Sequence, residues 1–202
     1  MSEEIEIEFK SMLTQSEYEH VFRFYQLSPS QTIKQTNLYY DTVDWQLKEN
    51  HMGLRIRQFD NHAEATLKVP QAVGLLEVTD SLTTEQVEAA LTKHRFAIDA
   101  KEILQRLDLL NINFNELRLI GKLTTQRGEL NVPEGKLALD ESWYSGQHDF
   151  ELELEVPNEQ FSLQDFKQFL HKFDLPYRAT QNKIARAVAA QQQLDDRKED
   201  PR

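Results

Sequence analysis

The sequence predicts an α+β protein whose strands pair in antiparallel hairpins, and three observations support this prediction. About eight segments alternate apolar and polar residues, which is the pattern of strands with two unlike faces. Short polar segments such as 59–64 (FDNHAE) and 131–136 (NVPEGK) separate some of them and predict hairpin turns. Longer segments preceded by helix-capping residues lie between or after these strands.

The alternating segments define the expected strands. In chain order they cover residues 4–10, 36–42, 53–59, 63–69, 75–82, 117–130, 135–142 and 148–156. Capping residues place the expected helices, because Ser, Thr or Asp can accept hydrogen bonds from the free N–H groups of a first turn. Helices are expected over 16–27, after Thr83 or Thr84, after Asp99, after Ser162 and over 182–193.

The composition is that of an ordinary globular protein. Apolar residues make up 39% and charged residues 28% of the 202 residues, which suits one domain with a substantial core. We expect this domain over residues 1–193, followed by a charged, flexible tail at 194–202. No segment approaches the roughly 18 apolar residues of a membrane span, and the N-terminus lacks signal-peptide features, so a cytoplasmic location is expected. The absence of cysteine excludes disulfides and thiolate metal ligands.

The formal net charge of the chain is -11. This value argues against duplex nucleic acid as a partner, because non-specific binding to its phosphates requires an excess of Lys and Arg. An anionic ligand would need a local cluster of basic residues within this acidic protein.

Charged residues occupy one face of several expected strands, and their signs are segregated by strand. The polar faces carry, strand by strand, Glu4, Glu6, Glu8 and Lys10, then Arg55 and Arg57, then Glu64, Thr66 and Lys68, then Asp140, and finally Asp149, Glu151, Glu153 and Glu155. For any one strand, a face exposed to water is the simpler interpretation. Taken together, however, like charges that face one another destabilise a sheet unless something intervenes.

A sheet that closes with its polar face inward resolves this conflict, since the apolar face then lies outside under the helices. Clusters of carboxylates would bind a divalent metal through oxygen ligands. Clusters of Arg and Lys would bind an anion, and phosphate matches the guanidinium fork best. The combination suits a metal-bound polyphosphate. Glu4 is expected either to reach this site or to stay solvated at its mouth.

The chain resembles the CYTH superfamily, the triphosphate tunnel metalloenzymes, from about residue 3 to about residue 190. Glu6, Glu8 and Lys10 match the Glu-x-Glu-x-Lys signature near the family's N-terminus. Later family segments are resembled, in the same order, by YYDT at 39–42, LRIR at 54–57, TLK at 66–68, ALD at 138–140, FELELE at 150–155 and NKIAR at 182–186. The likeness is strongest to bacterial members of the adenylate cyclase or thiamine triphosphatase type.

The resemblance implies an antiparallel eight-stranded β-tunnel, a closed barrel with a charged interior and flanking helices. It also implies Mg²⁺ or Mn²⁺ as a cofactor and a small-molecule triphosphate as the substrate. The phosphate-binding residues would be Arg55, Arg57, Lys68, Arg127 and Lys183, with Lys122 and Arg186 as further candidates. The metal ligands would be Glu6, Glu8 and Glu153, joined by Glu151 or Asp140. The catalytic residues would be Lys10, Glu8 and Arg57.

Two positions depart from the family pattern in the segments that would bind phosphate. Thr125 stands two residues before Arg127, where the family often has Lys. Lys122 could replace this lysine only if a bulge turned it inward, because simple alternation points it the other way. Asn182 precedes Lys183, where the family usually has Ser.

The leading functional hypothesis is metal-dependent hydrolysis of a terminal phosphoanhydride, with inorganic triphosphate as the first candidate and thiamine triphosphate or a nucleoside triphosphate as others. A second hypothesis is an adenylate cyclase that uses the same clamp to convert ATP to cyclic AMP. A third is a non-catalytic sensor of a nucleotide or polyphosphate, which the missing lysine favours slightly. We expect a monomer or a homodimer, without a membrane partner.

Overall fold

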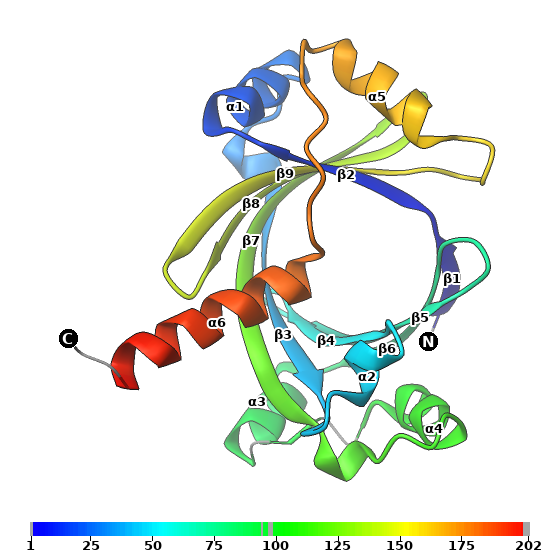
Figure 1. Ribbon diagram of the computed structural model, residues 1–202, viewed down its shortest axis with the longest axis vertical. Helices are drawn as coiled ribbons and strands as arrows, with labels where there is room; N and C mark the ends of the chain where they lie inside the picture. The colour runs from blue at the N-terminus through cyan, green and yellow to red at the C-terminus, as the bar shows by residue number, and fades with distance from the viewer. Residues whose placement is uncertain (1, 94, 97–98, 200–202) are drawn as a thin grey trace.

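One curled antiparallel sheet of nine strands forms the centre of the molecule, with helices around it (Figure 1). The computed structural model describes residues 2–93, 95–96 and 99–199. Across the sheet the strands are, in order, β1 (Ser2–Glu6), β6 (Leu75–Leu82), β5 (Ala63–Pro70), β4 (Gly53–Gln58), β3 (Thr32–Asp41), β7 (Arg118–Val132), β8 (Gly135–Tyr144), β9 (Gln147–Glu155) and β2 (Glu8–Leu13). The predicted α+β class with antiparallel strands is confirmed.

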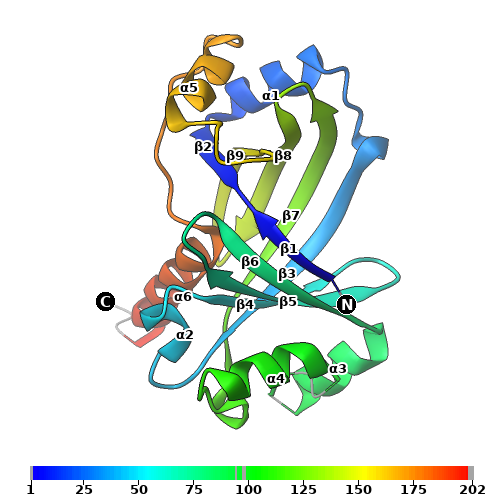
Figure 2. The same ribbon diagram turned by 90° about the vertical axis from the view of Figure 1, so that its right-hand side faces the viewer.

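Two pairs of helices lie at opposite ends of the curled sheet, and the last helix crosses it (Figure 1 and Figure 2). They are α1 (Gln15–Phe24), α2 (Gln46–Glu49), α3 (Thr84–Thr92), α4 (Lys101–Leu109), α5 (Leu163–His171) and α6 (Lys183–Glu199), with 3₁₀ turns at Pro29–Gln31 and Phe114–Glu116. Figure 2 shows α1 and α5 at one end and α3 and α4 at the other. Within the described ranges, none of the helices combines the length and apolar character needed to cross a bilayer.

The N-terminal segment closes the sheet into a tunnel. The segment predicted as one strand over 4–10 is two strands, because the pairing partner changes at Ile7. β1 pairs with β6 and β2 pairs with β9, and these two strands are the opposite edges of the sheet. The chain itself therefore joins one edge to the other. The predicted count of eight strands becomes nine, while the predicted tunnel is retained.

The turn between β5 and β6 packs closely against this junction. Gly74 has a φ of +71°, and a Cβ atom placed there would lie 2.4 Å from the carbonyl oxygen of Glu6. Only glycine fits this position without a backbone shift.

The predicted hairpins are present. β4 and β5 close at the Gln58–Ala63 pair, and β7 and β8 close at the Val132–Gly135 pair. The two faces of the strands also follow the predicted alternation. Leu54 and Ile56 of β4 are fully buried on the outer face. Arg55 and Arg57, which alternate with them, line the interior.

Two apolar clusters hold the helices on the outside of the tunnel. One joins β3 to β6 with α3 and α4 through side chains such as Leu67, Val87 and Ile103. The other joins β8 and β9 with α1 and α5 through side chains such as Leu152 and Phe166. Full burial of each such side chain stabilises the fold by about 1.5–3 kcal/mol. The hydrophobic core is therefore a shell around a polar centre.

Capping explains where most helices begin. Thr83 and Ser162 form capping boxes, as the sequence predicts. The predicted cap at Asp99 is wrong: Ala100 occupies the cap position of α4 without a side-chain hydrogen bond. Asp80 of β6 instead accepts a hydrogen bond from the N–H of Ile103 at 3.0 Å. A cap supplied from another element has no local sequence signal.

Helix α6 crosses the sheet and covers part of the interior face (Figure 1). Its Ala187 is fully buried beside Tyr39 and Leu123, and a Cβ atom at Gly121 would lie only 3.4 Å from the Ala187 side chain. The helix continues to Glu199, beyond the predicted end at 193, so much of the charged segment 194–202 is helical. Residues 200–202 lie outside the described residues.

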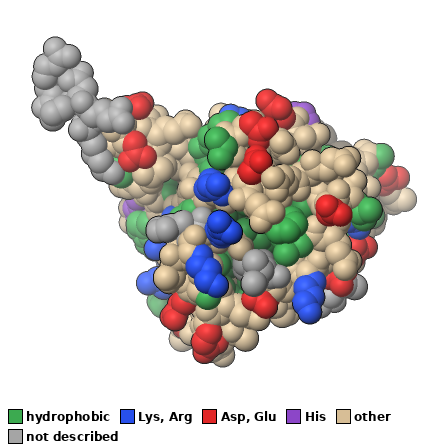
Figure 3. Space-filling model, turned by 90° about the horizontal axis from the view of Figure 1, so that it is seen from below, with side chains coloured by type: hydrophobic (Ala, Val, Ile, Leu, Met, Phe, Trp, Pro, Cys, Tyr) green, Lys and Arg blue, Asp and Glu red, His purple; other side chains and the backbone are tan. Residues whose placement is uncertain are grey.

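The outer surface mixes charged and apolar side chains. Seen from the end that carries α3 and α4, basic, acidic and hydrophobic side chains are scattered over this face (Figure 3). Leu109 of α4, for example, is 77% exposed. The segregation of positive and negative charge that the sequence predicts is found inside the tunnel.

The end of β3 is held by a buried carboxylate. The Oδ1 atom of Asp41 accepts hydrogen bonds from the N–H groups of Thr42 and Leu47 at 2.7 and 2.9 Å. Its Oδ2 atom accepts from the N–H of Lys48 at 3.0 Å. Asp41 therefore binds the free N–H groups at the start of α2, and this explains why the YYDT segment needs an aspartate there.

We predict that Asp41→Ala lowers the free energy of unfolding by about 2 kcal/mol or more, because three backbone donors lose their acceptor. Urea denaturation measures this change. Asp44→Ala is the matched control, since Asp44 is exposed and accepts hydrogen bonds from the side chains of Thr42 and Gln46. Equal losses for the two variants would contradict the capping role of Asp41.

Candidate active site

The polar faces of the strands enclose a cavity of about 330 Å³ inside the tunnel. Most of the predicted site residues line it, namely Glu6, Glu8, Lys10, Arg55, Arg57, Lys68, Arg127, Glu153 and Lys183. Glu4 also lines the cavity and is exposed, which places it at the mouth. Six different strands and the start of α6 thus bring these charged side chains to one cavity.

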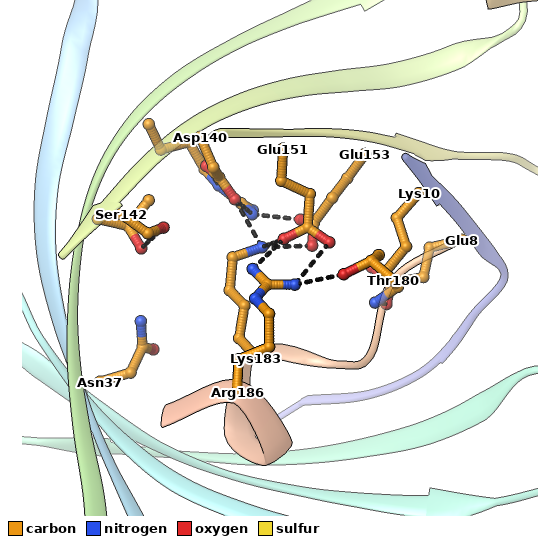
Figure 4. Close-up of polar contacts among 12 residues, drawn as sticks. Glu8, Lys10, Asn37, Asp140, Ser142, Glu151, Glu153, Thr180, Lys183 and Arg186 are labelled. Atoms are coloured by element: carbon orange, nitrogen blue, oxygen red, sulfur yellow. Dashed lines mark hydrogen bonds and ion pairs between the residues drawn. The ribbon is translucent and has the colours of Figure 1, made fainter. Parts of the chain in front are cut away.

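Lys183, the first residue of α6, contacts three carboxylates at once (Figure 4). Its Nζ atom lies 2.8 Å from Asp140, 2.7 Å from Glu151 and 2.5 Å from Glu153. Burial by itself lowers the pKa of Lys183, but the attraction of the three carboxylates outweighs it and holds this pKa well above the usual value. The ammonium is therefore fixed in its charged form.

Two arginines complete this network. Arg127 forms a bidentate pair with Asp140, with N···O distances of 2.8 and 2.6 Å, and also contacts Glu153. Arg186 lies 2.8 Å from Glu151 and 3.1 Å from Asp149. It pairs with these carboxylates outside the cavity and does not line it. Burial raises the pKa of Glu153, but Lys183 and Arg127 outweigh this effect and hold it well below the usual value.

A second group of charges lies on the wall formed by β1, β5 and β6. Lys68 contacts both Glu6 and Glu77, and Lys10 contacts Glu8. Burial and the negative charge of Glu8 raise the pKa of Glu6 to about 7. Glu77 shares Lys68 with Glu6, and this cation draws the pKa of Glu77 down against the effect of burial.

The arginines of β4 differ from the other interior cations because, among the described residues, their one ion pair is the 3.4 Å contact of Arg57 with Glu64. The Nε atom of Arg57 donates to the Oδ1 of Asn37 at 3.1 Å, and its Nη1 atom lies 3.4 Å from Glu64. The Nε atom of Arg55 is buried and has no hydrogen-bond partner in the described part of the chain. Burial, together with the positive charges of Arg55 and Arg127, lowers the pKa of Arg57 to about 10. This wall carries an excess of positive charge.

Lys122 is not in the cavity, which corrects its assignment as a phosphate ligand. It is exposed and lies opposite Leu38, on the outer side of β7. A bulge exists between β3 and β7, but it falls between Tyr39 and Tyr40 and does not turn Lys122 inward. Thr125 is buried in the interior, where its hydroxyl lies 3.1 Å from that of Ser142. The lysine of the family pattern therefore has no substitute at this place.

The predicted metal ligands fall into two groups on different walls. Asp140, Glu151 and Glu153 offer carboxylate oxygens that lie within 4.8 Å of one another. This all-oxygen donor set fits a hard divalent cation. Glu6 and Glu8 face the cavity from β1 and β2 and contact lysines instead.

Glu77 and Asn37 are among the interior side chains that are absent from the predicted set. Glu77 lies opposite Lys68 in the sheet, and Asn37 lies opposite Arg57. Both stand at inward positions of alternating strands, so the period of two contains a signal for them. Their partners depend on the register between strands, which the alternation does not specify.

A closed antiparallel tunnel with charged side chains inside and an apolar shell outside defines the class of this protein. The family model for the CYTH domain matches residues 4–188, and the chain belongs to the CYTH family. The protein named "Putative triphosphatase YjbK" from Bacillus subtilis (strain 168) is 36% identical over 186 residues, which cover 92% of this chain and 95% of that protein.

Solved structures show the same fold. A protein of Bacillus halodurans, described as a "putative adenylate cyclase", is 33% identical, with a TM-score of 0.85 over 92% of this chain and 98% of that one. The Hippeastrum protein HpAC1, described as a "putative adenylyl cyclase" with a dominant triphosphatase activity, is 22% identical. Its TM-score is 0.73 over 90% of this chain and 94% of that one.

We predict that Lys183→Met lowers the free energy of unfolding by about 3 kcal/mol at pH 7, because three buried carboxylates lose their shared cation. The lowered pKa values of Asp140 and Glu153 stabilise the wild type above the ordinary carboxyl pKa and cease to do so as the pH falls. The raised pKa of Lys183 keeps its contribution complete below pH 10.5. The difference between variant and wild type should therefore shrink from about pH 5 downward.

Urea denaturation at several pH values measures this difference. Lys172→Met is the control, because Lys172 forms an exposed pair with Glu134 and should change the free energy of unfolding by less than about 1 kcal/mol. A loss for Lys183→Met that stayed constant from pH 7 to pH 3 would contradict the network.

Proposed function

We propose that this protein is a divalent-metal-dependent triphosphatase that hydrolyses a terminal phosphoanhydride, with inorganic triphosphate as its first substrate. The observation that carries this proposal is the wall formed by Arg55 and Arg57, where positive charge exceeds negative charge. The same cavity is lined by Glu153, a member of the buried carboxylate cluster. A polyphosphate chain with its metal ion carries both charges that this cavity requires.

The cationic wall would hold the phosphates. A guanidinium group presents its donors in a planar fork that matches two phosphate oxygens, and each such bond is charge-assisted. The Arg57 side chain is 14% exposed, so its attraction for an anion is less screened by water than that of a surface arginine. Lys68 and Lys10 extend the row of cations along the cavity. These groups would also offset the charge that builds up on phosphoryl oxygens during transfer.

The buried carboxylates Asp140, Glu151 and Glu153 would hold the divalent cation, with Glu6 and Glu8 as further ligands from the other wall. When bound, Mg²⁺ or Mn²⁺ would neutralise phosphate charge and lower the pKa of a bound water. Lys183 contacts all three buried carboxylates, so its ammonium and a metal ion compete for the same oxygens.

The lining of the cavity favours a substrate without a nucleobase. Its ring-bearing side chains are Tyr39 and His51 among the described lining residues, and Tyr39 is only 5% exposed. A base would find little aromatic surface on which to stack. The name of the Bacillus subtilis relative, "Putative triphosphatase YjbK", supports hydrolysis of a triphosphate.

The proposal predicts release of orthophosphate from inorganic triphosphate, faster than from ATP or thiamine triphosphate, in the presence of Mg²⁺ or Mn²⁺. Chelation of the metal should abolish it. Arg57→Ala and Glu8→Ala should lower kcat/KM about a hundredfold or more, because each removes a charged group from the cavity. Lys172→Ala, on the exposed surface of α5's C-terminal end, should leave the rate unchanged.

Product analysis separates the alternatives. Pyrophosphate and cyclic AMP from ATP, without orthophosphate, would identify a cyclase. Tight binding of tripolyphosphate without any turnover would identify a sensor, and either result would overturn the triphosphatase proposal.

A further inference from the structure

Asn37 is a buried amide on the interior face of β3, next to a cavity-lining arginine, and none of the family motifs assigns it to the site. It is 1% exposed and lies on β3, directly opposite Arg57 in the register of β3 and β4. Its Oδ1 atom accepts a hydrogen bond from the Nε atom of Arg57 at 3.1 Å. The contact is a direct cross-strand pair, so the sheet itself sets its geometry.

The two arginines of β4 have different neighbours because of the same register. Arg57 lies between Asn37 on β3 and Glu64 on β5. Arg55 lies between Tyr39 on β3 and Thr66 on β5, and its buried Nε atom is without a hydrogen-bond partner among the described residues. One guanidinium is oriented before any ligand arrives, and the other keeps an unused donor.

Arg127 has a carboxylate, Asp140, at the cross-strand position that Asn37 holds for Arg57. Asp140 lies opposite Arg127 and binds it through two hydrogen bonds. That pair offsets the charge of Arg127 and occupies its Nε and one Nη atom. An amide orients a guanidinium through Nε without neutralising it. Beside its bond to Asn37, Arg57 has one carboxylate contact among the described residues, from Nη1 to Glu64 at the longer distance of 3.4 Å.

We propose that Asn37 is a positioning residue, which holds Arg57 through its Nε atom so that the Nη atoms meet the phosphates, and that the free Nε of Arg55 is satisfied by the same phosphate chain. This inference rests on the proposed function, because it assumes a polyphosphate ligand. The neutral amide of Asn37 then contributes to the affinity for an anion, because it orients Arg57 and leaves the positive charge of this residue available.

A double-mutant cycle tests this role, with binding of tripolyphosphate measured by calorimetry in the presence of a chelator, where the proposed hydrolysis does not proceed. Asn37→Ala should weaken binding about tenfold, since a hydrogen bond to a charged group is lost. Lysine has no Nε atom, so Asn37→Ala should cause no further loss in the Arg57→Lys background. Asn37→Asp should also weaken binding, because its carboxylate keeps the hydrogen bond but neutralises Arg57.

Ser142→Ala is the control, since it removes a buried interior hydroxyl that bonds to Thr125 and does not line the cavity. It should leave tripolyphosphate binding unchanged. An equal loss from Asn37→Ala in both backgrounds would overturn the positioning role, as would wild-type protein that fails to bind tripolyphosphate. A wild type that releases no phosphate yet shows the expected coupling would overturn the triphosphatase and support the role of Asn37.

Discussion

The rest of the structure depends on one constraint: a tunnel with its charged face inward must find a partner for nearly every charge that it buries. The contacts of Lys183 with Asp140, Glu151 and Glu153 meet this constraint for the acidic strands. They also attach the first residue of α6 to β8 and β9, far away in the sequence. Removing one member of such a network costs more than the whole network contributes, because the remaining charges stay buried. The buried charges of this network therefore stabilise the fold only when all of them are present.

The wall of Arg55 and Arg57 is the exception to this pairing of buried charges, and the proposed function depends on it. An unused buried donor and a guanidinium with a lowered pKa both cost stability in the free protein. Such local conflicts are expected where a protein binds its ligand. The neutral partner of Arg57 and the absence of a lysine at Thr125 set how much positive charge the cavity offers. On this view, affinity for a polyphosphate comes from charges that the sheet orients but does not neutralise.

Much of the fold and of the cavity was predictable, because a period of two separates an outer apolar face from an inner charged face. Nine of the predicted side chains meet in one cavity for this reason. The remainder depends on pairing between distant segments. The break at Ile7, the cap that Asp80 provides for α4 and the contact of Asn37 with Arg57 all arise from register. Lys122 was misassigned because the existence and place of a bulge cannot be derived from alternation.

The most direct test of this account is urea denaturation of the wild type and Arg55→Gln, with and without tripolyphosphate, against sulfate at equal ionic strength. A ligand that binds only the folded state raises its stability with concentration. The account predicts that tripolyphosphate raises the midpoint of the wild type well beyond the effect of sulfate. Arg55→Gln should be at least as stable as the wild type without ligand, because it removes a buried donor that lacks a partner, and should lose most of the response. A variant that is less stable without ligand yet keeps the full response would contradict the account.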